Sequence, residues 1–294
     1  FKAALPTIVH YCESDVVLVC IHDSKVPLKF RVITYPKEHV NIKFFKPLPY
    51  TYYLENRKED VLTIPLGSFT EDNDNNKLMT GELFDIKGNE LKVVSLDGHR
   101  ISIRKIELKN EYSPRKVVVP GKTLNEISKI LSGDTDKFVN IFFTQKHIVF
   151  EFENTTVVSR LIEGEYFRIE QMLSNDYETK FVVNKKEFLN CIDRATLLVK
   201  EGDKKPIIMN ITDSNMELKI NSIVGSMNED IDIEKQGKDI MIGFNPKFLI
   251  DALRVIDDEN VTLYMMNPKA PCFIKNDEQS YIYLILPVNF TTVN

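Results

Sequence analysis

The sequence predicts an α+β protein built from repeated units, in which helices cover one face of antiparallel sheets. Three observations indicate this fold class. The nine residues Glu90–Gly98 read ELKVVSLDG and Glu217–Gly225 read ELKINSIVG, so Glu-Leu-Lys, a serine and a glycine recur at one spacing. Short alternating segments typical of strands surround both copies. Helix patterns accompany both copies in the same order, so the chain contains a structural repeat.

The repeat also predicts the domain organisation. The order helix, strands, helix, strands is expected twice in full, at residues 49–176 and 177–294, and its second half once more at residues 1–48. The chain has 294 residues, which fits two or three domains. We therefore expect three domains, of which the first lacks roughly 70–80 residues before Phe1 if all units are equal in size.

Residues 1–48 are expected to supply the tail of a helix and two strands, at Phe1–Leu5, Val16–Ile21 and Phe30–Thr34. Residues 49–176 begin with a weak helix, Arg57–Ser68, which Pro65 and Gly67 interrupt, and an Asp- and Asn-rich loop, Glu71–Asn76. A clearer helix is expected at Gly121–Leu131, with apolar residues on one face. The strands expected here are Leu83–Ile86 and Leu91–Ser95, joined by a turn at Lys87–Asn89, then Ile101–Ile106, Asn140–Phe143, His147–Phe152 and Thr156–Ile162.

Residues 177–294 contain two helices with recognisable starts. Asn184 is followed by Glu187 three positions later, the pattern of a capping box. Asn245 is followed by Pro246, which favours the first helical position. The strands expected here are Ile207–Ile211, Met216–Asn221, Glu229–Ile233, Val261–Met265, Cys272–Ile274 and Tyr281–Leu286.

Composition excludes several classes of protein. Apolar residues make up 43% of the chain, yet no run approaches the roughly 20 that a membrane span needs. No charged-then-apolar leader is seen, so a cytoplasmic location is expected. The four cysteines form no CxxC pair and no histidine lies at ligand spacing, so neither a metal nor a cofactor is expected. The net charge of −5 requires any nucleic-acid binding to use a local basic surface.

Cations recur on the faces of the three clearest helices. Solvated helix faces ordinarily contain lysine, and for a single helix this is the simpler reading. Recurrence on several repeated helices of an acidic chain instead favours a surface that faces phosphates without reading base sequence. The candidate DNA-facing residues are Lys122, Lys129, Lys186, Arg194, Lys247 and Arg254.

The tetrad Asp97-Gly98-His99-Arg100 gathers an acid, an imidazole and a guanidinium around a glycine turn. A catalytic role would make Asp97 orient His99 as a general base. No nucleophile or metal-ligand set accompanies the pair, and the second copy of the repeat has no Asp or His there. A polar rim on a binding pocket and a plain β-turn are the alternatives, and the rim is favoured.

The carboxyl-terminal stretch Ser280–Phe290 is nearly continuous in apolar residues up to Pro287. Such a run is typical of a buried strand. If its end is exposed, it indicates a docking surface for a partner. The sequence leaves both readings open.

Five motifs in this chain resemble the bacterial DNA polymerase III beta subunit, the replicative sliding clamp. The resemblance covers about residues 30–290. The matching motifs are VSLDGHRIS at Val94–Ser102, VVPGK at Val118–Lys122, SRLIEGEY at Ser159–Tyr166, GFNPK at Gly243–Lys247 and YLILPV at Tyr283–Val288.

The resemblance implies three clamp domains per subunit, with antiparallel sheets outside and helices lining the hole of a ring around duplex DNA. It implies a non-enzymatic tether, a head-to-tail homodimer when full length, that holds a polymerase on DNA of any sequence. The partners expected are the polymerase III alpha subunit, the clamp loader and repair polymerases, each through a short peptide motif. Two alternatives stay open: a fragment that binds peptides without closing a ring, and an enzyme with its site at Asp97–Arg100.

The resemblance also implies site residues. The ring interface would pair Phe30 with Leu197 and Leu198 of a second copy. The family's peptide groove lies between the second and third domains and combines residues from three parts of the chain. Here it would use Met79, Leu96, Gly98, His99, Arg100, Ile101, Phe167, Gln171, Met172, Asn245, Phe248, Pro271, Leu284, Leu286, Pro287 and Val288.

Overall fold

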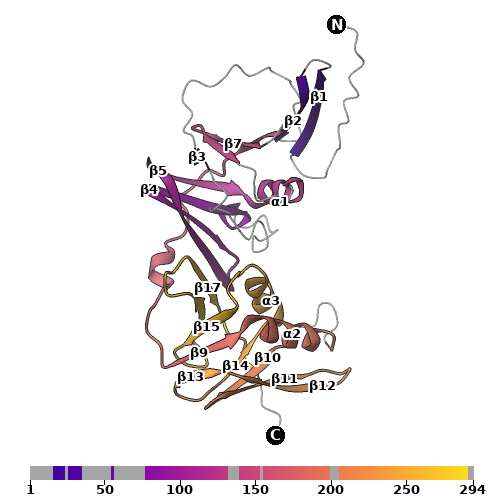
Figure 1. The fold of residues 1–294 in the computed structure, drawn as a ribbon, viewed down its shortest axis with the longest axis vertical. Coiled ribbons are helices and arrows are strands. Elements are labelled where there is room, and N and C mark those ends of the chain that lie inside the picture. Colours follow the sequence, from indigo (N-terminus) through magenta and orange to yellow (C-terminus); the bar gives the residue numbers. More distant parts are fainter. Residues whose placement is uncertain are drawn as a thin grey trace. The chain divides into compact units, whose positions relative to one another are not determined.

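The computed structural model describes residues 16–23, 26–34, 54–55, 77–131, 139–152, 155–198 and 205–290. The chain divides into two compact units (Figure 1). The first comprises Phe1–Ser95 and Lys105–Tyr166, and the second comprises Leu96–Arg104 and Phe167–Asn294. The short segment Leu96–Arg104 therefore belongs to the second unit although its chain neighbours belong to the first. The expected helices at Phe1–Leu5 and Arg57–Ser68 and the loop at Glu71–Asn76 lie outside the described residues.

The first unit contains a sheet with the strand order β1-β2-β8-β7-β6-β3. All its strand pairs are antiparallel except β2 with β8, which is parallel. A short 3-10 helix, Lys77–Thr80, precedes the long strands β4 and β5. The elements are β1 (Val16–Asp23), β2 (Val26–Thr34), β3 (Leu54–Glu55), β4 (Gly81–Leu96), β5 (Arg100–Pro120), α1 (Gly121–Ile130), β6 (Asn140–Phe143), β7 (His147–Phe152) and β8 (Thr155–Arg160).

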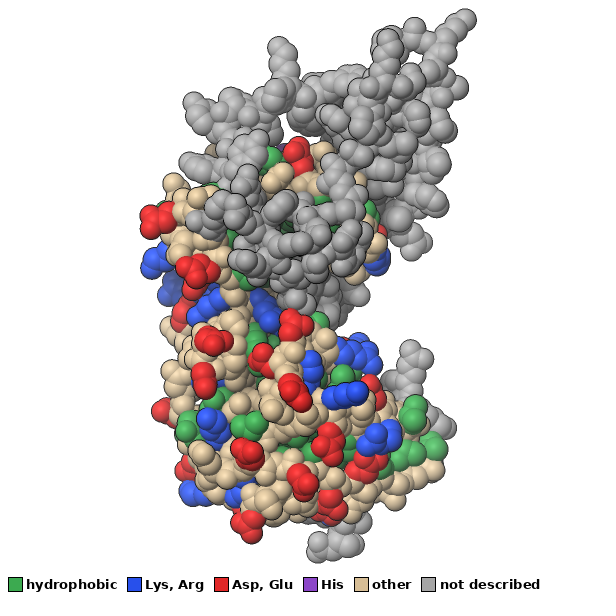
Figure 2. Space-filling model, viewed as in Figure 1, with side chains coloured by type: hydrophobic (Ala, Val, Ile, Leu, Met, Phe, Trp, Pro, Cys, Tyr) green, Lys and Arg blue, Asp and Glu red, His purple; other side chains and the backbone are tan. Residues whose placement is uncertain are grey.

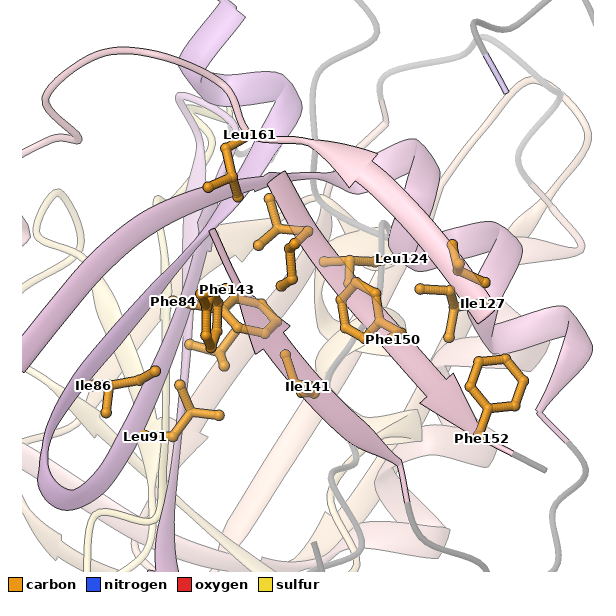
Figure 3. Close-up of a cluster of buried hydrophobic side chains, with 14 of the residues drawn as sticks. Phe84, Ile86, Leu91, Leu124, Ile127, Ile141, Phe143, Phe150, Phe152 and Leu161 are labelled. Carbon is orange, nitrogen blue, oxygen red and sulfur yellow. The ribbon is translucent and has the colours of Figure 1, made fainter. Parts of the chain in front are cut away.

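The core of the first unit forms where α1 packs against β6 and β7 (Figure 3). Leu124 and Ile127 are three positions apart, so they share one face of the helix, and both are buried. Strand alternation brings Phe84 and Phe150 into the same cluster. Each such side chain contributes about 1.5–3 kcal/mol when it leaves water. The helix predicted at Gly121–Leu131 is confirmed to within one residue.

The second unit contains a sheet with the strand order β12-β11-β10-β14 and most of a second sheet, with the strand order β13-β9-β15-β16-β17-β5-β4. Only Arg100–Arg104 of β5 contribute to the second sheet within this unit, where they pair with β17. A short 3-10 helix, Ile169–Met172, precedes the strands. The elements are β9 (Thr179–Asn184), α2 (Lys185–Thr196), β10 (Ile207–Thr212), β11 (Asn215–Asn221), β12 (Ser226–Asp232), β13 (Glu234–Gly237), β14 (Ile240–Phe244), α3 (Pro246–Arg254), β15 (Asn260–Met265), β16 (Cys272–Lys275) and β17 (Tyr281–Ile285).

Both helices of the second unit begin at the asparagines that the sequence indicates. The Asn184 side chain accepts a hydrogen bond from the N–H of Glu187 at 3.1 Å, and Asn245 accepts one from the N–H of Lys247 at 3.0 Å. Each bond satisfies one of the backbone donors that a helix start leaves without an intrahelical partner. Among the described residues, no helix is long and apolar enough to cross a membrane.

One predicted turn is wrong. Strand β4 runs without interruption from Gly81 to Leu96, where two strands and a turn at Lys87–Asn89 were expected. Gly88 does have a positive φ of 62°, the left-handed geometry that identifies turn glycines. A single left-handed residue within a strand makes a local irregularity without reversing the chain, so the hairpin that the pattern predicts does not form. The reversal occurs later, between Leu96 and Arg100, at the tetrad.

Candidate functional site

The tetrad Asp97–Arg100 forms the tight turn between β4 and β5. Gly98 has a φ of 71°, and an added Cβ there would meet no atom within 4 Å. Glycine is therefore favoured at this position by backbone conformation and not by space. The N–H of Asp97 donates to the carbonyl of Arg100 at 3.2 Å, which closes the turn.

Arg100 is fixed by groups from two parts of the second unit. Its Nε donates to Oδ2 of Asp97 at 2.8 Å, and its terminal nitrogen donates to Oδ2 of Asp251 on α3 at 2.8 Å. The guanidinium also lies 4.3 Å from the centre of the Phe248 ring, a cation–π contact. Only 7% of the Arg100 side chain is exposed. The guanidinium thus joins the turn to α3.

His99 is the exposed polar side chain of the tetrad. Its ring stacks on Phe248 with centroids 6.0 Å apart and an angle of 24° between the planes. The Asp97 carboxylate accepts from the backbone N–H of His99 and from Arg100, and among the described residues no hydrogen bond joins it to the imidazole. The catalytic alternative needed Asp97 to orient that ring, so it lacks its geometric basis.

Strand β17 brings the carboxyl-terminal residues alongside the tetrad. Leu284 pairs with Ile101, and the N–H of Leu286 donates to the carbonyl of His99 at 2.9 Å. Leu96, Ile101 and Leu284 are buried, whereas 37% of Leu286 is exposed. The strand is therefore buried, as the first reading expects, and the residue that follows it is exposed, while the docking surface stays a prediction.

The chain after the strand then crosses toward the other sheet of the same unit. The N–H of Val288 donates to the carbonyl of Gly243 at 2.8 Å. Gly243 lies in β14, two residues before Asn245, which caps α3. The segment 286–288 therefore passes from the tetrad to the start of α3, with Pro287 and Val288 half-buried.

A third segment of the second unit contributes Phe167, Gln171 and Met172. Ile169 anchors the short helix because it is 2% exposed, whereas Met172 is 53% exposed. The chain that follows is attached to the sheet, since Nζ of Lys275 donates to Oδ1 of Asn175 at 2.8 Å. Lys275 lies over the ring of Tyr264, and its burial lowers the pKa of its ammonium.

Direct contacts therefore join many of the predicted peptide-site residues. Hydrogen bonds, ring contacts or strand pairing connect His99, Arg100, Ile101, Phe248, Leu284 and Leu286. Gln171 and Met172 are exposed in the same unit, and Phe167 and Pro271 are half-buried there. Met79 belongs to the first unit, in the short helix Lys77–Thr80. Sequence reasoning missed Asp251, for which the helical position on α3 gave no distinguishing signal.

The six predicted DNA-facing cations are all exposed on helices, and they fall into two classes. Three have carboxylate partners: Lys129 contacts Glu126 at 2.8 Å, Arg254 contacts Asp193 at 3.2 Å, and Arg194 contacts Glu229. Within the part of the chain that the structure describes, Lys122, Lys186 and Lys247 have no ion-pair partner. Acidic and basic side chains are interspersed over the described face in Figure 2.

A second exposed apolar surface lies at the end of α2. Leu197 is 81% exposed and Ile223, in the β11–β12 turn, is 92% exposed. A Cβ built on Gly225 would lie 3.7 Å from Leu198, so the turn and the helix end are neighbours. We call Leu197, Leu198, Ile223 and Val224 the α2-end patch. The predicted partner residue, Phe30, lies in β2.

Comparisons with known proteins identify the family. The model of the DNA polymerase III beta subunit central domain matches residues 66–167, and the model of its C-terminal domain matches residues 170–289. The beta sliding clamp of Staphylococcus epidermidis is 34% identical over 214 residues, which cover 72% of this chain and 56% of that protein. The chain thus spans about half the length of the curated relatives it matches.

Solved structures agree with this result. A DNA polymerase III beta subunit from Eubacterium rectale is 60% identical with a TM-score of 0.81, and the match covers 96% of this chain and 76% of that one. The DNA polymerase sliding clamp from Bacillus subtilis is 25% identical with a TM-score of 0.79, over 96% of this chain and 74% of that one. This chain therefore belongs to the DNA polymerase III beta subunit family, the beta sliding clamps.

Proposed function

We propose that this chain is a processivity clamp, a non-enzymatic tether that holds polymerases on duplex DNA through short peptides. The observation that supports this most strongly is the convergence of 96–101, 248–251 and 284–288 on one surface of the second unit. That surface combines exposed apolar Leu286 with a fixed polar turn. Family membership supports the same function.

The chemistry of the surface favours a short peptide with two or three apolar anchors and a polar side chain. Leu286 and Met172 are exposed and apolar, and unbranched Met172 can adapt to different ligands. His99 offers a polar contact that is supported from behind by Phe248. A peptide of the form Gln-Leu-x-Leu-Phe, the type the family recognises, supplies this combination. The partners would be the alpha subunit, the clamp loader and repair polymerases.

The DNA-binding part of the proposal rests on the helix cations. Lys186 and Lys247 lie on α2 and α3, whose side chains meet through the Arg254–Asp193 ion pair. Cations without carboxylate partners are available to phosphates, and such contacts depend on charge and not on base sequence. Duplex DNA of any sequence is therefore the proposed partner, which implies action in the cytoplasm where the chromosome lies.

Ring formation is the remaining part of the proposal. The α2-end patch exposes large aliphatic side chains, and an exposed apolar cluster of this kind indicates an interaction surface. A second copy of the chain, through the region of Phe30, is the proposed occupant.

A peptide-binding chain that does not close a ring is the second candidate function. It is favoured by one observation. All the proposed peptide-site residues except Met79 belong to the second unit, so peptide binding requires neither a ring nor DNA.

Calorimetric titration with Gln-Leu-x-Leu-Phe tests the peptide-binding proposal. We expect micromolar affinity, on the order of −8 kcal/mol, because the contact is small. Leu286→Asp would place a charge in the apolar part of the contact and should abolish binding. His99→Ala should only weaken binding, because an exposed side chain keeps part of its hydration.

The matched control is Ile223→Asp, the same aliphatic-to-carboxylate change at an exposed residue outside the surface. This control should bind like the parent. If a folded Leu286→Asp variant also binds like the parent, the assignment of the surface is wrong.

A further inference from the structure

At position 243 the available space, and not the backbone conformation, favours glycine. Its φ lies outside the left-handed region, so its backbone conformation suits any residue. A Cβ built on it would lie 2.7 Å from Cδ1 of Phe290 and 3.1 Å from the carbonyl oxygen of Val288. Real Cβ contacts are not this short, so the Phe290 ring occupies the position that a side chain at residue 243 would need.

Within the described chain, residues 286–290 contact the rest of the second unit at a few points. The Phe290 ring makes the last of these contacts along the chain. Strand β17 ends at Ile285, and the residues that follow form no regular element. Among the described residues, two backbone bonds hold them: Leu286 donates to His99, and Val288 donates to Gly243. Two backbone bonds contribute only about 1 kcal/mol each, so a segment held by them alone would open readily.

We propose that Phe290 and Gly243 are a positioning pair that fixes Leu286, Pro287 and Val288 for peptide binding. This inference rests on the proposed peptide-binding function and adds two residues to it. The ring packs on the bare backbone of β14 and holds the segment down beyond Val288. Leu286, which donates its N–H to the carbonyl of His99, is then presented in one fixed position beside the tetrad.

The consequence for binding is energetic. A peptide that meets an ordered segment does not have to order it, and this cost would otherwise reduce affinity. Phe290 is half-buried at the end of the described chain and is separated from Leu286 by three residues. It acts through Leu286 and need not touch the peptide. A positioning role therefore predicts an effect on segment mobility as well as on affinity.

The test compares Phe290→Ala, Phe290→Leu, Gly243→Ala and the double variant Gly243→Ala/Phe290→Ala. Peptide affinity is measured by calorimetry, and exchange of the Leu286 and Val288 amide hydrogens is measured without peptide. Phe290→Ala and Gly243→Ala should each weaken binding on the order of tenfold and speed exchange of both amides. In Phe290→Leu, peptide affinity and the exchange rates of both amides should lie closer to those of the parent than they do in Phe290→Ala. The double variant should be close to Phe290→Ala, because the shortest contact of the added Cβ, at 2.7 Å, is with the ring that Phe290→Ala removes.

Gly225→Ala is the matched control, since an added Cβ there meets Leu198 at an ordinary 3.7 Å. It should leave affinity and both exchange rates unchanged. Unchanged exchange of Leu286 and Val288 in Phe290→Ala would overturn the inference, as would additive losses in the double variant. If the parent itself fails to bind the peptide, the proposed function fails, yet the exchange rates still decide whether Phe290 orders the segment. Because Phe290→Ala removes only half-buried atoms near the chain end, it keeps the test valid if Gly243→Ala does not fold.

Discussion

Arg100 lies at the turn between β4 and β5, and the groups around its guanidinium determine its structural role. Two carboxylates and an aromatic ring surround its guanidinium. A planar guanidinium can donate in two directions while it stacks, whereas an ammonium cannot reproduce this geometry. Arg100 therefore contributes to the proposed peptide site by holding the turn on α3, while His99 remains exposed for contact.

Arg100→Lys should consequently destabilise the second unit by about 2–3 kcal/mol, the range for charged hydrogen bonds that lose a partner. It should also weaken peptide binding, because the turn is no longer fixed to Asp251. Chemical denaturation and calorimetry measure the two effects. Arg160→Lys is the control, since Arg160 is exposed and pairs with exposed Glu163 at 3.2 Å. That surface pair should change stability by less than about 1 kcal/mol. Equal effects of the two substitutions would contradict the assigned role of Arg100.

We expect His147, at the start of β7, to make the stability of the first unit depend on pH. Burial, and then the charges of Arg160 and Lys146, lower the pKa of His147 below 6.5. The unfolded imidazole keeps its ordinary pKa and binds a proton more readily than the folded one. The unfolded state therefore gains protons first, and stability that is present above about pH 6.5 is lost as the pH falls toward the folded pKa.

Unfolding of the parent and of His147→Gln between about pH 7 and pH 5 measures this effect. The free energy of unfolding should fall more steeply for the parent, because glutamine does not titrate. Carboxylates are common to both proteins and cancel in the difference. Parallel pH profiles would show that His147 is not the responsible group.

At the scale of elements, local signals predicted α1, α2 and α3 well and strand β4 poorly. Apolar spacing predicts α1, and asparagine caps together with apolar spacing predict α2 and α3, because these signals lie within a few residues of each other. The sequence predicts two strands in place of β4 because glycine, found at Gly88, is typical of turns. Only pairing with a neighbouring strand keeps such a residue within a strand. The burial of Arg100 could not be predicted from the sequence, because its partner Asp251 is 151 positions away in the chain.

The helix cations give a prediction at this scale. Changing Lys122, Lys186 and Lys247 to Glu should weaken binding to duplex DNA, because these exposed lysines have no carboxylate partner within the described part of the chain. Each phosphate contact that is lost should lower the salt slope of the binding constant by about one unit. Titration of fluorescent duplex DNA at several salt concentrations measures both quantities.

The comparison variant changes Lys129, Arg194 and Arg254 to Gln. Their charges are already neutralised by Glu126, Glu229 and Asp193, so this triple change should have the smaller effect on affinity. If the Lys-to-Glu variant binds like the parent at every salt concentration, these helices do not face DNA.

For the whole molecule, the α2-end patch predicts self-association. Leu197→Asp with Ile223→Asp should reduce the rise of sedimentation coefficient with protein concentration, because the substitutions remove apolar area and add like charges. Ile130→Asp, an exposed position at the end of α1 in the first unit, is the control. Self-association that the double substitution leaves unchanged, or none in the parent, would contradict a second copy as the occupant.

The assembly of the proposed peptide surface depends on contacts that the sequence alone does not predict. Its residues could be named only through a family resemblance, since periodicity gives no reason for Leu284 to meet Ile101. That meeting depends on the pairing of β17 with β5, a contact between distant parts of the chain. The division into units adds that Leu96–Arg104 belongs with Phe167–Asn294.

The most direct test of the account is amide hydrogen exchange with and without saturating Gln-Leu-x-Leu-Phe peptide. The peptide should slow exchange in residues 96–101, 167–172 and 284–290, because the proposed peptide site draws on these three segments of the second unit. Exchange in β6, β7 and β8 of the first unit should not change. Protection that is absent from the three segments while the peptide is bound, or that falls mainly on the first unit, would contradict the account.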